Sequence, residues 1–189
     1  MLMPRFVVTG APGTGKSSVI SLLGDRHATV SEPARELIAE HAAQTGEATL
    51  DGRPELFLTR LVQRSIDDFR SVSGATVVLF DRGLPDCVAY AAVLGMDREP
   101  LLEQANEFRY DSPVFIAPLW KEIYTTDALR RATFEQVETF HFHLRSAYLQ
   151  LGYGLIELPK ISPSGRVEVI TEHLHLGADT PQPDQRRNA

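Results

Sequence analysis

Short apolar runs recur along the chain, and each is followed by glycine, aspartate or proline. The runs cover residues 5–9, 28–32, 75–80, 112–117 and 152–158. They are too short for ordinary helices, and most are rich in β-branched or aromatic residues, which is typical of strands buried in a parallel sheet. We therefore predict five strands over these residues.

Between these runs, apolar residues recur every three or four positions, as they do on one face of a helix. This spacing predicts helices over residues 17–23, 35–41, 55–72, 86–94, 99–108, 134–151 and 167–176. The longest stripe is in 134–151 and includes Phe140, Leu144 and Tyr148. Polar stretches with glycine or proline at 44–54 and 159–163 are predicted loops.

Strands that alternate with helices predict parallel pairing, because parallel strands need a crossover connection and that connection is usually a helix. The fold class that we predict is α/β, a three-layer α/β/α arrangement around a five-stranded parallel sheet. Residues 1–176 contain no evident repeat or linker and are expected to form one domain. Residues 177–189 are polar and without periodicity, so we expect a disordered C-terminal tail.

Composition narrows the range of partners. The 189 residues carry a formal net charge of −6 and include one cysteine, Cys87. An acidic chain lacks the basic surface typical of nucleic-acid binding, and one cysteine allows neither an internal disulfide nor a thiolate zinc cluster. The apolar N-terminal stretch is too short for a signal peptide or membrane span. We expect a cytoplasmic protein, monomer or homodimer, without nucleic-acid or membrane partners.

Residues 10–17 match the phosphate-binding pattern G-x-x-x-x-G-K-[ST], and they lie directly between a predicted strand and a predicted helix. Glycines in such a loop let backbone N–H groups approach phosphates without a Cβ clash. We expect Lys16 to reach the β- and γ-phosphates of ATP and Ser17 to bind Mg²⁺. The candidate nucleotide ligands are Gly10, Ala11, Pro12, Gly13, Thr14, Gly15, Lys16, Ser17 and Ser18. The choice between ATP and GTP stays open.

Two acidic residues follow predicted strands, at the sheet edge where ligands bind in open α/β sheets. Asp81 can hold Mg²⁺ there, although an ordinary helix-capping role is the alternative. Glu32 can accept the proton of an attacking hydroxyl, although it can also be a simple acid at a helix start. Both are therefore candidate catalytic residues.

Arginines lie beside these acids and near the longest helix. Arg35 and Arg82 adjoin Glu32 and Asp81, while the pair Arg130–Arg131 precedes helix 134–151 and can also be a solvated helix start. Guanidinium groups bind phosphates and neutralise charge in phosphoryl transfer. The candidate catalytic residues are Lys16, Glu32, Asp81, Arg82, Arg130 and Arg131, and the candidate metal ligands are Ser17 and Asp81. The candidate substrate-binding residues are Glu32, Arg35, Arg82 and Asp86.

The order GAPGTGKS, EPAR and DRG resembles P-loop kinases of the nucleoside and nucleotide kinase type. The resemblance implies that Glu32 is the catalytic base, and that Asp81 and Arg82 serve the metal, the nucleophile and phosphate binding. It also implies an arginine-bearing lid at residues 127–135 and an adenine subsite at 159–163.

Residues 81–90 (DRGLPDCVAY) and 110–124 give a closer resemblance, to bacterial ATPases described as AAA-domain proteins, which are similar to the ribosylnicotinamide kinase domain. This resemblance covers roughly residues 5–176.

These features predict an ATP- and Mg²⁺-dependent phosphotransferase that acts on a small acceptor, a nucleoside or a nucleotide. One alternative is an ATP-hydrolysing switch with a protein partner and no small acceptor. Another is a nucleotide-binding module without catalysis. The sequence does not identify the acceptor.

Overall fold

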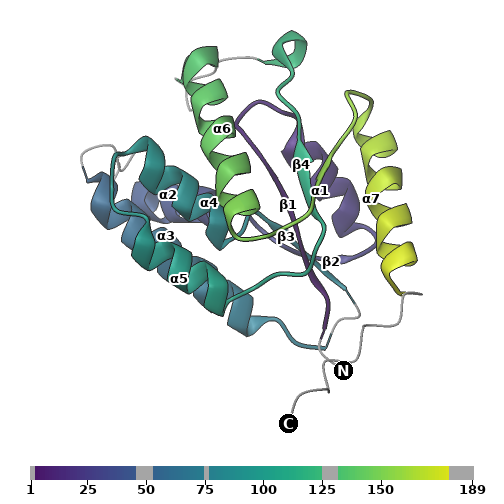
Figure 1. Cartoon of the computed structure of the whole chain (residues 1–189), viewed down its shortest axis with the longest axis horizontal. Coiled ribbons are helices and arrows are strands. Elements are labelled where there is room, and N and C mark those ends of the chain that lie inside the picture. The colour runs from purple at the N-terminus through teal and green to yellow at the C-terminus, as the bar shows by residue number, and fades with distance from the viewer. Residues whose placement is uncertain (1–2, 46–52, 75–76, 125–131, 179–189) are drawn as a thin grey trace.

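The computed structural model describes residues 3–45, 53–74, 77–124 and 132–178 (Figure 1). The strands are β1 (Arg5–Gly10), β2 (Ala28–Val30), β3 (Val78–Asp81), β4 (Val114–Ala117) and β5 (Leu155–Glu157). The helices are α1 (Lys16–Gly24), α2 (Pro33–Thr45), α3 (Pro54–Ser71), α4 (Leu84–Val93), α5 (Glu99–Glu107), α6 (Phe134–Gln150) and α7 (Pro163–Ala178), with a 3-10 turn η1 (Lys121–Ile123).

The strands form one parallel sheet in the order β2-β3-β1-β4-β5, which confirms the predicted sheet. The register places Val7 of β1 opposite Phe80 of β3 and Val8 opposite Phe115 of β4. β1 is thus the central strand. The chain moves from β1 to one side of the sheet for β2 and β3, and to the other side for β4 and β5.

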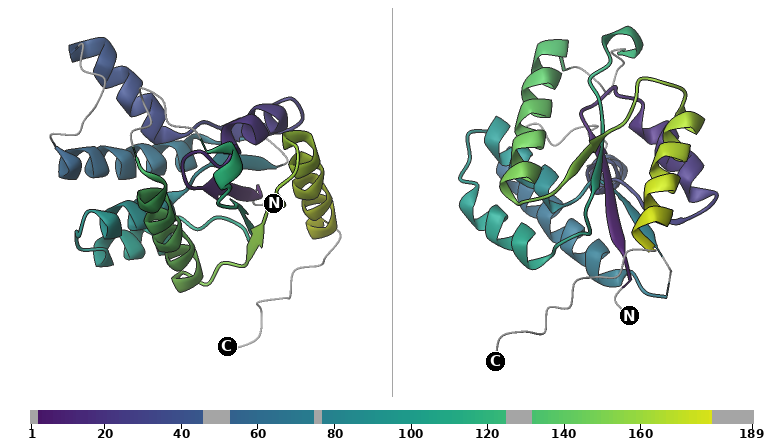
Figure 2. Two further views of the ribbon diagram at one scale, coloured as in Figure 1. Left: turned by 90° about the horizontal axis from the view of Figure 1, so that it is seen from above. Right: turned by 45° about the vertical axis from the view of Figure 1, so that its right-hand side comes forward.

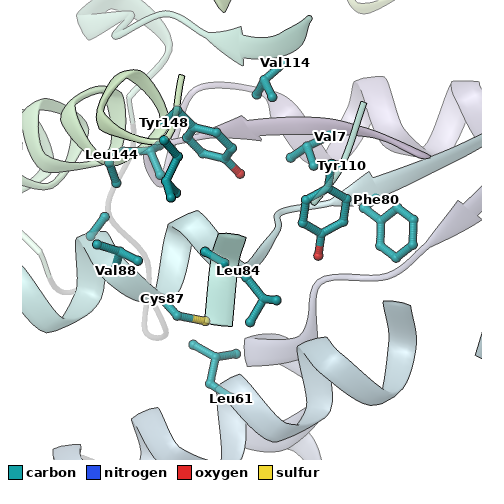
Figure 3. Packing of buried hydrophobic residues seen from close by; sticks show 14 of the residues in the cluster. Val7, Leu61, Phe80, Leu84, Cys87, Val88, Tyr110, Val114, Leu144 and Tyr148 are labelled. Atoms are coloured by element: carbon teal, nitrogen blue, oxygen red, sulfur yellow. The ribbon is translucent and has the colours of Figure 1, made fainter. Parts of the chain in front are cut away.

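Helices cover both faces of the sheet, which gives the predicted three layers (Figure 2). Successive strand residues point to opposite faces. Val8, Leu79 and Phe115 pack against α1 and α7. Val7 and Phe80 belong to the larger cluster on the other face, which is built with α3, α4, α5 and α6 (Figure 3). Among the described helices, none is both long and apolar enough to cross a bilayer.

Several helices begin earlier than the sequence pattern predicted. α2 begins at Pro33, α4 at Leu84 and α7 at Pro163, where we had expected residues 35, 86 and 167. Proline is favourable in the first turn of a helix, because the N–H that it lacks has no partner there in any case. Reading each proline as part of a loop therefore placed these starts too late.

Other boundaries also differ. β2 ends at Val30, β3 begins at Val78 and includes Asp81, and α2 extends to Thr45, into the predicted loop. α7 continues to Ala178, so the first two residues of the predicted tail are helical. The rest of that tail, residues 179–189, lies outside the described residues.

The buried face of α6 offers a direct test of the packing. Leu144 is 0% exposed in the larger core cluster, whereas Leu149 on the same helix is 56% exposed. We expect Leu144→Ala to lower the free energy of unfolding by about 2–5 kcal/mol, because it leaves a cavity, when measured by urea unfolding. Leu149→Ala is the control and should change it by less than about 0.5 kcal/mol. Equal effects would contradict this orientation of α6.

Candidate active site

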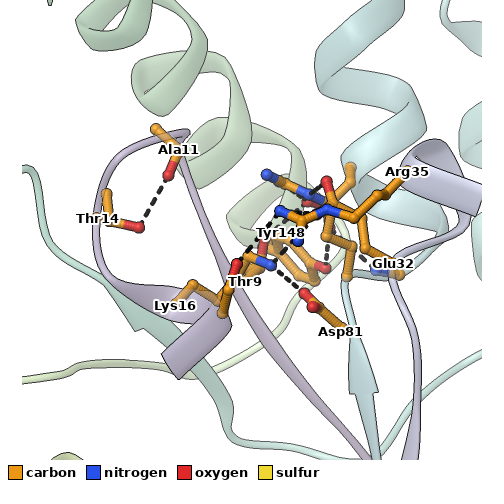
Figure 4. A network of polar contacts seen from close by, with 12 residues as sticks. Thr9, Ala11, Thr14, Lys16, Glu32, Arg35, Asp81 and Tyr148 are labelled. Atoms are coloured by element: carbon orange, nitrogen blue, oxygen red, sulfur yellow. Dashed lines mark hydrogen bonds and ion pairs between the residues drawn. The ribbon is translucent and has the colours of Figure 1, made fainter. Parts of the chain in front are cut away.

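The phosphate-binding loop joins the carboxyl end of β1 to the start of α1. Gly15 is the N-cap of α1 and has a left-handed backbone (φ 78°), which glycine adopts without strain. No side chain caps this end of α1, so its first N–H groups can bind an anion. Within the loop, the buried Thr14 hydroxyl donates to the Ala11 carbonyl at 2.8 Å (Figure 4). The loop is therefore held by its own hydrogen bond.

The segment around η1 covers part of this loop. A Cβ on Gly13 would lie 2.5 Å from the Tyr124 ring, and a Cβ on Gly15 would lie 3.4 Å from Ile123. Gly13 also has a left-handed backbone, with φ 78°. Both glycines are therefore required by backbone geometry, and Gly13 also by the close approach of Tyr124.

The sheet topology brings the phosphate loop next to the acidic strand ends. The strands β1 and β3 are neighbours in the sheet. The helix that follows β1, α1, packs on one face of the sheet, and the helix that follows β3, α4, packs on the other, so the two connections separate at the carboxyl ends of these strands. Ligand sites in open α/β sheets form at such a divergence. There the Lys16 ammonium donates a hydrogen bond to the Asp81 carboxylate, and it lies 3.9 Å from Glu32 Oε2 (Figure 4).

Lys16 and Asp81 form a buried ion pair. Burial lowers the pKa of the Lys16 ammonium and raises the pKa of the Asp81 carboxyl, and the attraction between the two groups opposes both shifts. Removing either partner would leave an uncompensated buried charge, which is strongly unfavourable. Asp81 is therefore the carboxylate that balances the charge of Lys16 at this position.

Glu32 lies among three cations. Arg82 Nε donates to its Oε1 at 2.7 Å, and Arg35 Nη2 lies 3.8 Å from its Oε2. Burial by itself would raise the pKa of Glu32, but Arg82, Lys16 and Arg35 outweigh burial and hold this pKa at about 2. Glu32 is therefore a carboxylate at neutral pH and can accept hydrogen bonds or a proton.

Arg82 is held in an unusual backbone conformation. Its φ of 79° is left-handed, which costs a residue other than glycine about 1–2 kcal/mol. Its buried guanidinium bonds Glu32 on one side and Asp86 Oδ1 on the other, at 2.8 Å. Burial lowers the pKa of Arg82, but the neighbouring carboxylates raise it well above its usual value. The local strain is therefore offset by contacts that fix the guanidinium beside Glu32.

Asp86 accepts hydrogen bonds from four protein donors. Its Oδ1 accepts from Thr9 at 2.7 Å and from Arg82, and its Oδ2 accepts from Tyr148 at 2.6 Å and from the Gly83 backbone at 3.1 Å. Because the carboxylate is 2% exposed and fully engaged, this arrangement leaves it no free position for a substrate. The geometry assigns Asp86 to orienting Arg82 rather than to the predicted substrate contact.

The structure brings most of the predicted site residues together. Lys16 contacts Asp81 and Glu32, and Arg82 contacts Glu32. Arg35 Nη2 lies 3.4 Å from Ser17 Oγ. Arg130 and Arg131 lie outside the described residues.

The predicted Mg²⁺ ligands fit the way this ion binds in nucleotide sites. In the described part of the chain, no group of three or more His, Cys, Asp or Glu side chains could by itself hold a metal. Mg²⁺ usually takes one or two protein oxygens together with phosphates and waters, so Ser17 and Asp81 fit an ion that arrives with a nucleotide.

Sequence reasoning missed several contributors. Tyr148 was read as part of the apolar stripe of its helix and Thr9 only as the end of a strand, yet both hold Asp86. Arg166 was not singled out, although its Nη1 donates to the Thr14 carbonyl of the phosphate loop at 2.7 Å. The spacing of residues along the sequence does not indicate these contacts, because the partners are far apart in the chain.

Comparisons with known proteins agree with the fold. A family model described as an AAA domain matches residues 5–166. Comparison with curated protein sequences gives no match. Deoxyadenosine kinase from M. mycoides with bound dCTP has a TM-score of 0.66 at 14% identity, over 91% of this chain and 99% of that one.

Two further solved structures are similar. The NadR protein in complex with NR has a TM-score of 0.67 at 18% identity, over 98% of this chain and 54% of that one. Thymidylate kinase from Candida albicans has a TM-score of 0.58 at 12% identity, over 93% and 92%. At these identities the likeness establishes the fold, which is that of P-loop nucleoside and nucleotide kinases.

The low pKa of Glu32 makes its contribution to stability depend on pH. A carboxyl with a pKa of about 2 in the folded chain, against its usual 4.5, stabilises the fold above pH 4.5, and this contribution is lost as the pH falls toward 2. We expect Glu32→Gln to lower the free energy of unfolding by up to about 3 kcal/mol at pH 7 and by much less at pH 3.

Urea unfolding at the two pH values measures this difference. The exposed Glu157→Gln is the control and should show a small effect at both. A Glu32→Gln penalty of the same size at pH 7 and pH 3 would show that lost packing, and not ionisation, is responsible.

Proposed function

This chain belongs to the AAA-domain family, and we propose that it is an ATP- and Mg²⁺-dependent phosphotransferase that acts on a small acceptor, a nucleoside or a nucleotide. The observation that carries the proposal is the Glu32 carboxylate, which is held ionised next to Lys16 and the phosphate loop. A proton acceptor beside a phosphate site is what transfer to a hydroxyl requires.

Donor binding begins with an exchange of partners at Lys16. The ammonium bound to Asp81 in this structure turns to the β- and γ-phosphates, where it offsets their negative charge. Asp81 and Ser17 would then hold Mg²⁺, which would supply charge neutralisation and orientation of the phosphates. Lys16 and Asp81 would thus give up their ion pair, Lys16 for phosphate and Asp81 for the metal.

Acceptor activation depends on Glu32. A hydroxyl of the acceptor donates to this carboxylate and loses its proton to it as the new O–P bond forms and the bond from the γ-phosphorus to the β-phosphate bridge oxygen breaks. The low pKa of Glu32 makes it a weak base. The transition state of phosphoryl transfer is loose, so the rate depends more on the position of the acceptor hydroxyl than on early removal of its proton. Arg82 holds Glu32 in place, and Arg130 and Arg131 are proposed to stabilise the transferred group.

The nature of the acceptor is supported by the proteins with a similar fold. Their descriptions include deoxyadenosine kinase with dCTP or with dATP, NadR with NR and a thymidylate kinase. These favour a nucleoside-like acceptor. Location in the cytoplasm and the absence of nucleic-acid and membrane partners remain predictions from composition.

Hydrolysis of ATP as a protein-coupled switch is the second candidate, and the AAA-domain description of the family favours it. A switch needs no acceptor base, so Glu32 fixed by Arg82 favours the kinase. Turnover of ATP should discriminate between the two. A kinase shows weak hydrolysis alone and a large increase with one compound of a nucleoside and nucleotide panel, whereas a switch shows no such response.

Lys16→Ala tests the donor site. It removes the charge that faces the β- and γ-phosphates, so we expect ATP binding in calorimetry to weaken at least about tenfold and turnover to be lost. Far-UV circular dichroism should show a folded protein. Wild-type affinity and turnover in this variant would contradict the assignment of the phosphate loop.

Glu32→Gln tests the base. The amide keeps the shape of the side chain but cannot take a proton, so acceptor phosphorylation should fall by about 10²-fold or more, while ATP affinity changes little. Glu36→Gln, in the first turn of helix α2 directly after Glu32, is the matched control, because Glu36 pairs with Arg64 outside the site. A loss below about threefold in Glu32→Gln would assign the proton to another group.

A further inference from the structure

Arg166 lies directly behind the phosphate-binding loop. It belongs to the first turn of α7 and is 1% exposed. Its Nη1 donates to the Thr14 carbonyl at 2.7 Å, and its Nε donates to the Pro159 carbonyl at 2.8 Å. The same Nη1 lies 3.6 Å from the position that a Cβ on Gly15 would take. The guanidinium is thus in contact with the backbone of the loop itself.

Among the residues that the structure describes, no carboxylate compensates the positive charge of Arg166, and burial alone lowers its pKa. Its Nη2 is buried without a hydrogen-bond partner, and the face of Trp120 lies 5.0 Å from the guanidinium carbon. The charge also lies at the N-terminal end of α7, where the helix dipole disfavours a cation.

Burial of a cation without a counter-charge is costly, and buried charges in proteins are normally paired. Arg82 is also buried, but its guanidinium is paired with the carboxylates of Glu32 and Asp86. Arg166 has two neutral carbonyls and an aromatic face instead. Arg166 lies beside Thr14 and Gly15, so an anion bound by the phosphate loop would be close to its charge.

We propose that the anion is the polyphosphate of the bound nucleotide, and that Arg166 is a fixed positive charge behind the loop that favours nucleoside triphosphates over monophosphates. The inference rests on the proposed function, because it needs a nucleotide at this loop. Two effects act together. The guanidinium attracts the phosphates through space, and the attraction grows with their charge. Its hydrogen bond to the Thr14 carbonyl also polarises the Thr14–Gly15 peptide, which makes the Gly15 N–H a stronger donor.

A purely structural role is the competing explanation, in which Arg166 only joins α7 to the loop. Loss of such a joint would weaken the binding of every nucleotide by the same factor. Loss of a counter-charge would weaken binding in proportion to phosphate charge. The two explanations therefore differ in how the effect depends on the ligand.

The experiment compares Arg166→Gln, which keeps a donor but removes the charge, with Arg166→Lys, which keeps the charge. Calorimetry with Mg²⁺ measures the affinity of AMP, ADP and a non-hydrolysable ATP analogue. We expect Arg166→Gln to bind the ATP analogue about tenfold more weakly, ADP less so, and AMP within about twofold of wild type. Arg166→Lys should keep the wild-type preference for the ATP analogue over AMP within about threefold.

Arg145→Gln is the control for general loss of positive charge, since Arg145 pairs with Glu157 at the surface, and it should leave all three affinities unchanged. Equal weakening for all three ligands in Arg166→Gln, or no weakening, overturns the inference and leaves the proposed function standing. If Arg166→Gln does not fold, loss of the ATP preference in folded Arg166→Lys overturns it. A wild-type protein that binds none of the ligands overturns the proposed function as well.

Discussion

The pairing of buried charges at the carboxyl ends of β1 and β3 is the constraint on which the site depends. Lys16, Asp81, Arg82 and Asp86 are buried there, and Glu32 is partly buried beside them. Each charge is tolerated only because another faces it, since an unpaired charge in the interior is strongly unfavourable. A ligand that separates two paired side chains must therefore bring opposite charges of its own to balance each of them. On the proposed function, magnesium-loaded nucleotide would do so, because it would bring anions for Lys16 and a cation for Asp81.

The fold creates this cluster through its connections. α1 and α4 leave neighbouring strands toward opposite faces, and the phosphate loop and the end of β3 meet at one edge of the sheet, where Lys16 contacts Asp81. Asp86 then joins three elements, because Thr9 of β1 and Tyr148 of α6 both donate to it while it holds Arg82. The left-handed backbone of Arg82 is maintained by the same contacts. The orientation of Glu32 therefore depends on the packed core, which fixes Asp86 and Arg82, as well as on its own loop.

Two buried arginines differ in how their charge is balanced. Arg82 is neutralised by carboxylates of the protein, so it can orient Glu32 before any ligand binds. Arg166 has no such partner among the described residues, and on our proposal the ligand provides it. On the proposed function, the first arrangement would hold Glu32 in position before the acceptor binds. The second makes donor binding sensitive to the number of phosphates, because the compensation grows with ligand charge.

The sequence by itself determined the order of strands and helices, the phosphate loop and the nearness of Glu32, Asp81 and Arg82. Those features depend on local periodicity, on glycine and lysine spacing, and on the rule that parallel strands end at one edge. The predicted starts of the helices that begin near a proline were too late in the chain, because a proline is compatible with both a loop and a first helical turn. Only the tertiary structure showed which groups Asp86, Tyr148 and Arg166 contact. The contacts Tyr148–Asp86 and Arg166–Thr14 join residues 62 and 152 positions apart, and no local pattern records which distant donor reaches a buried acceptor.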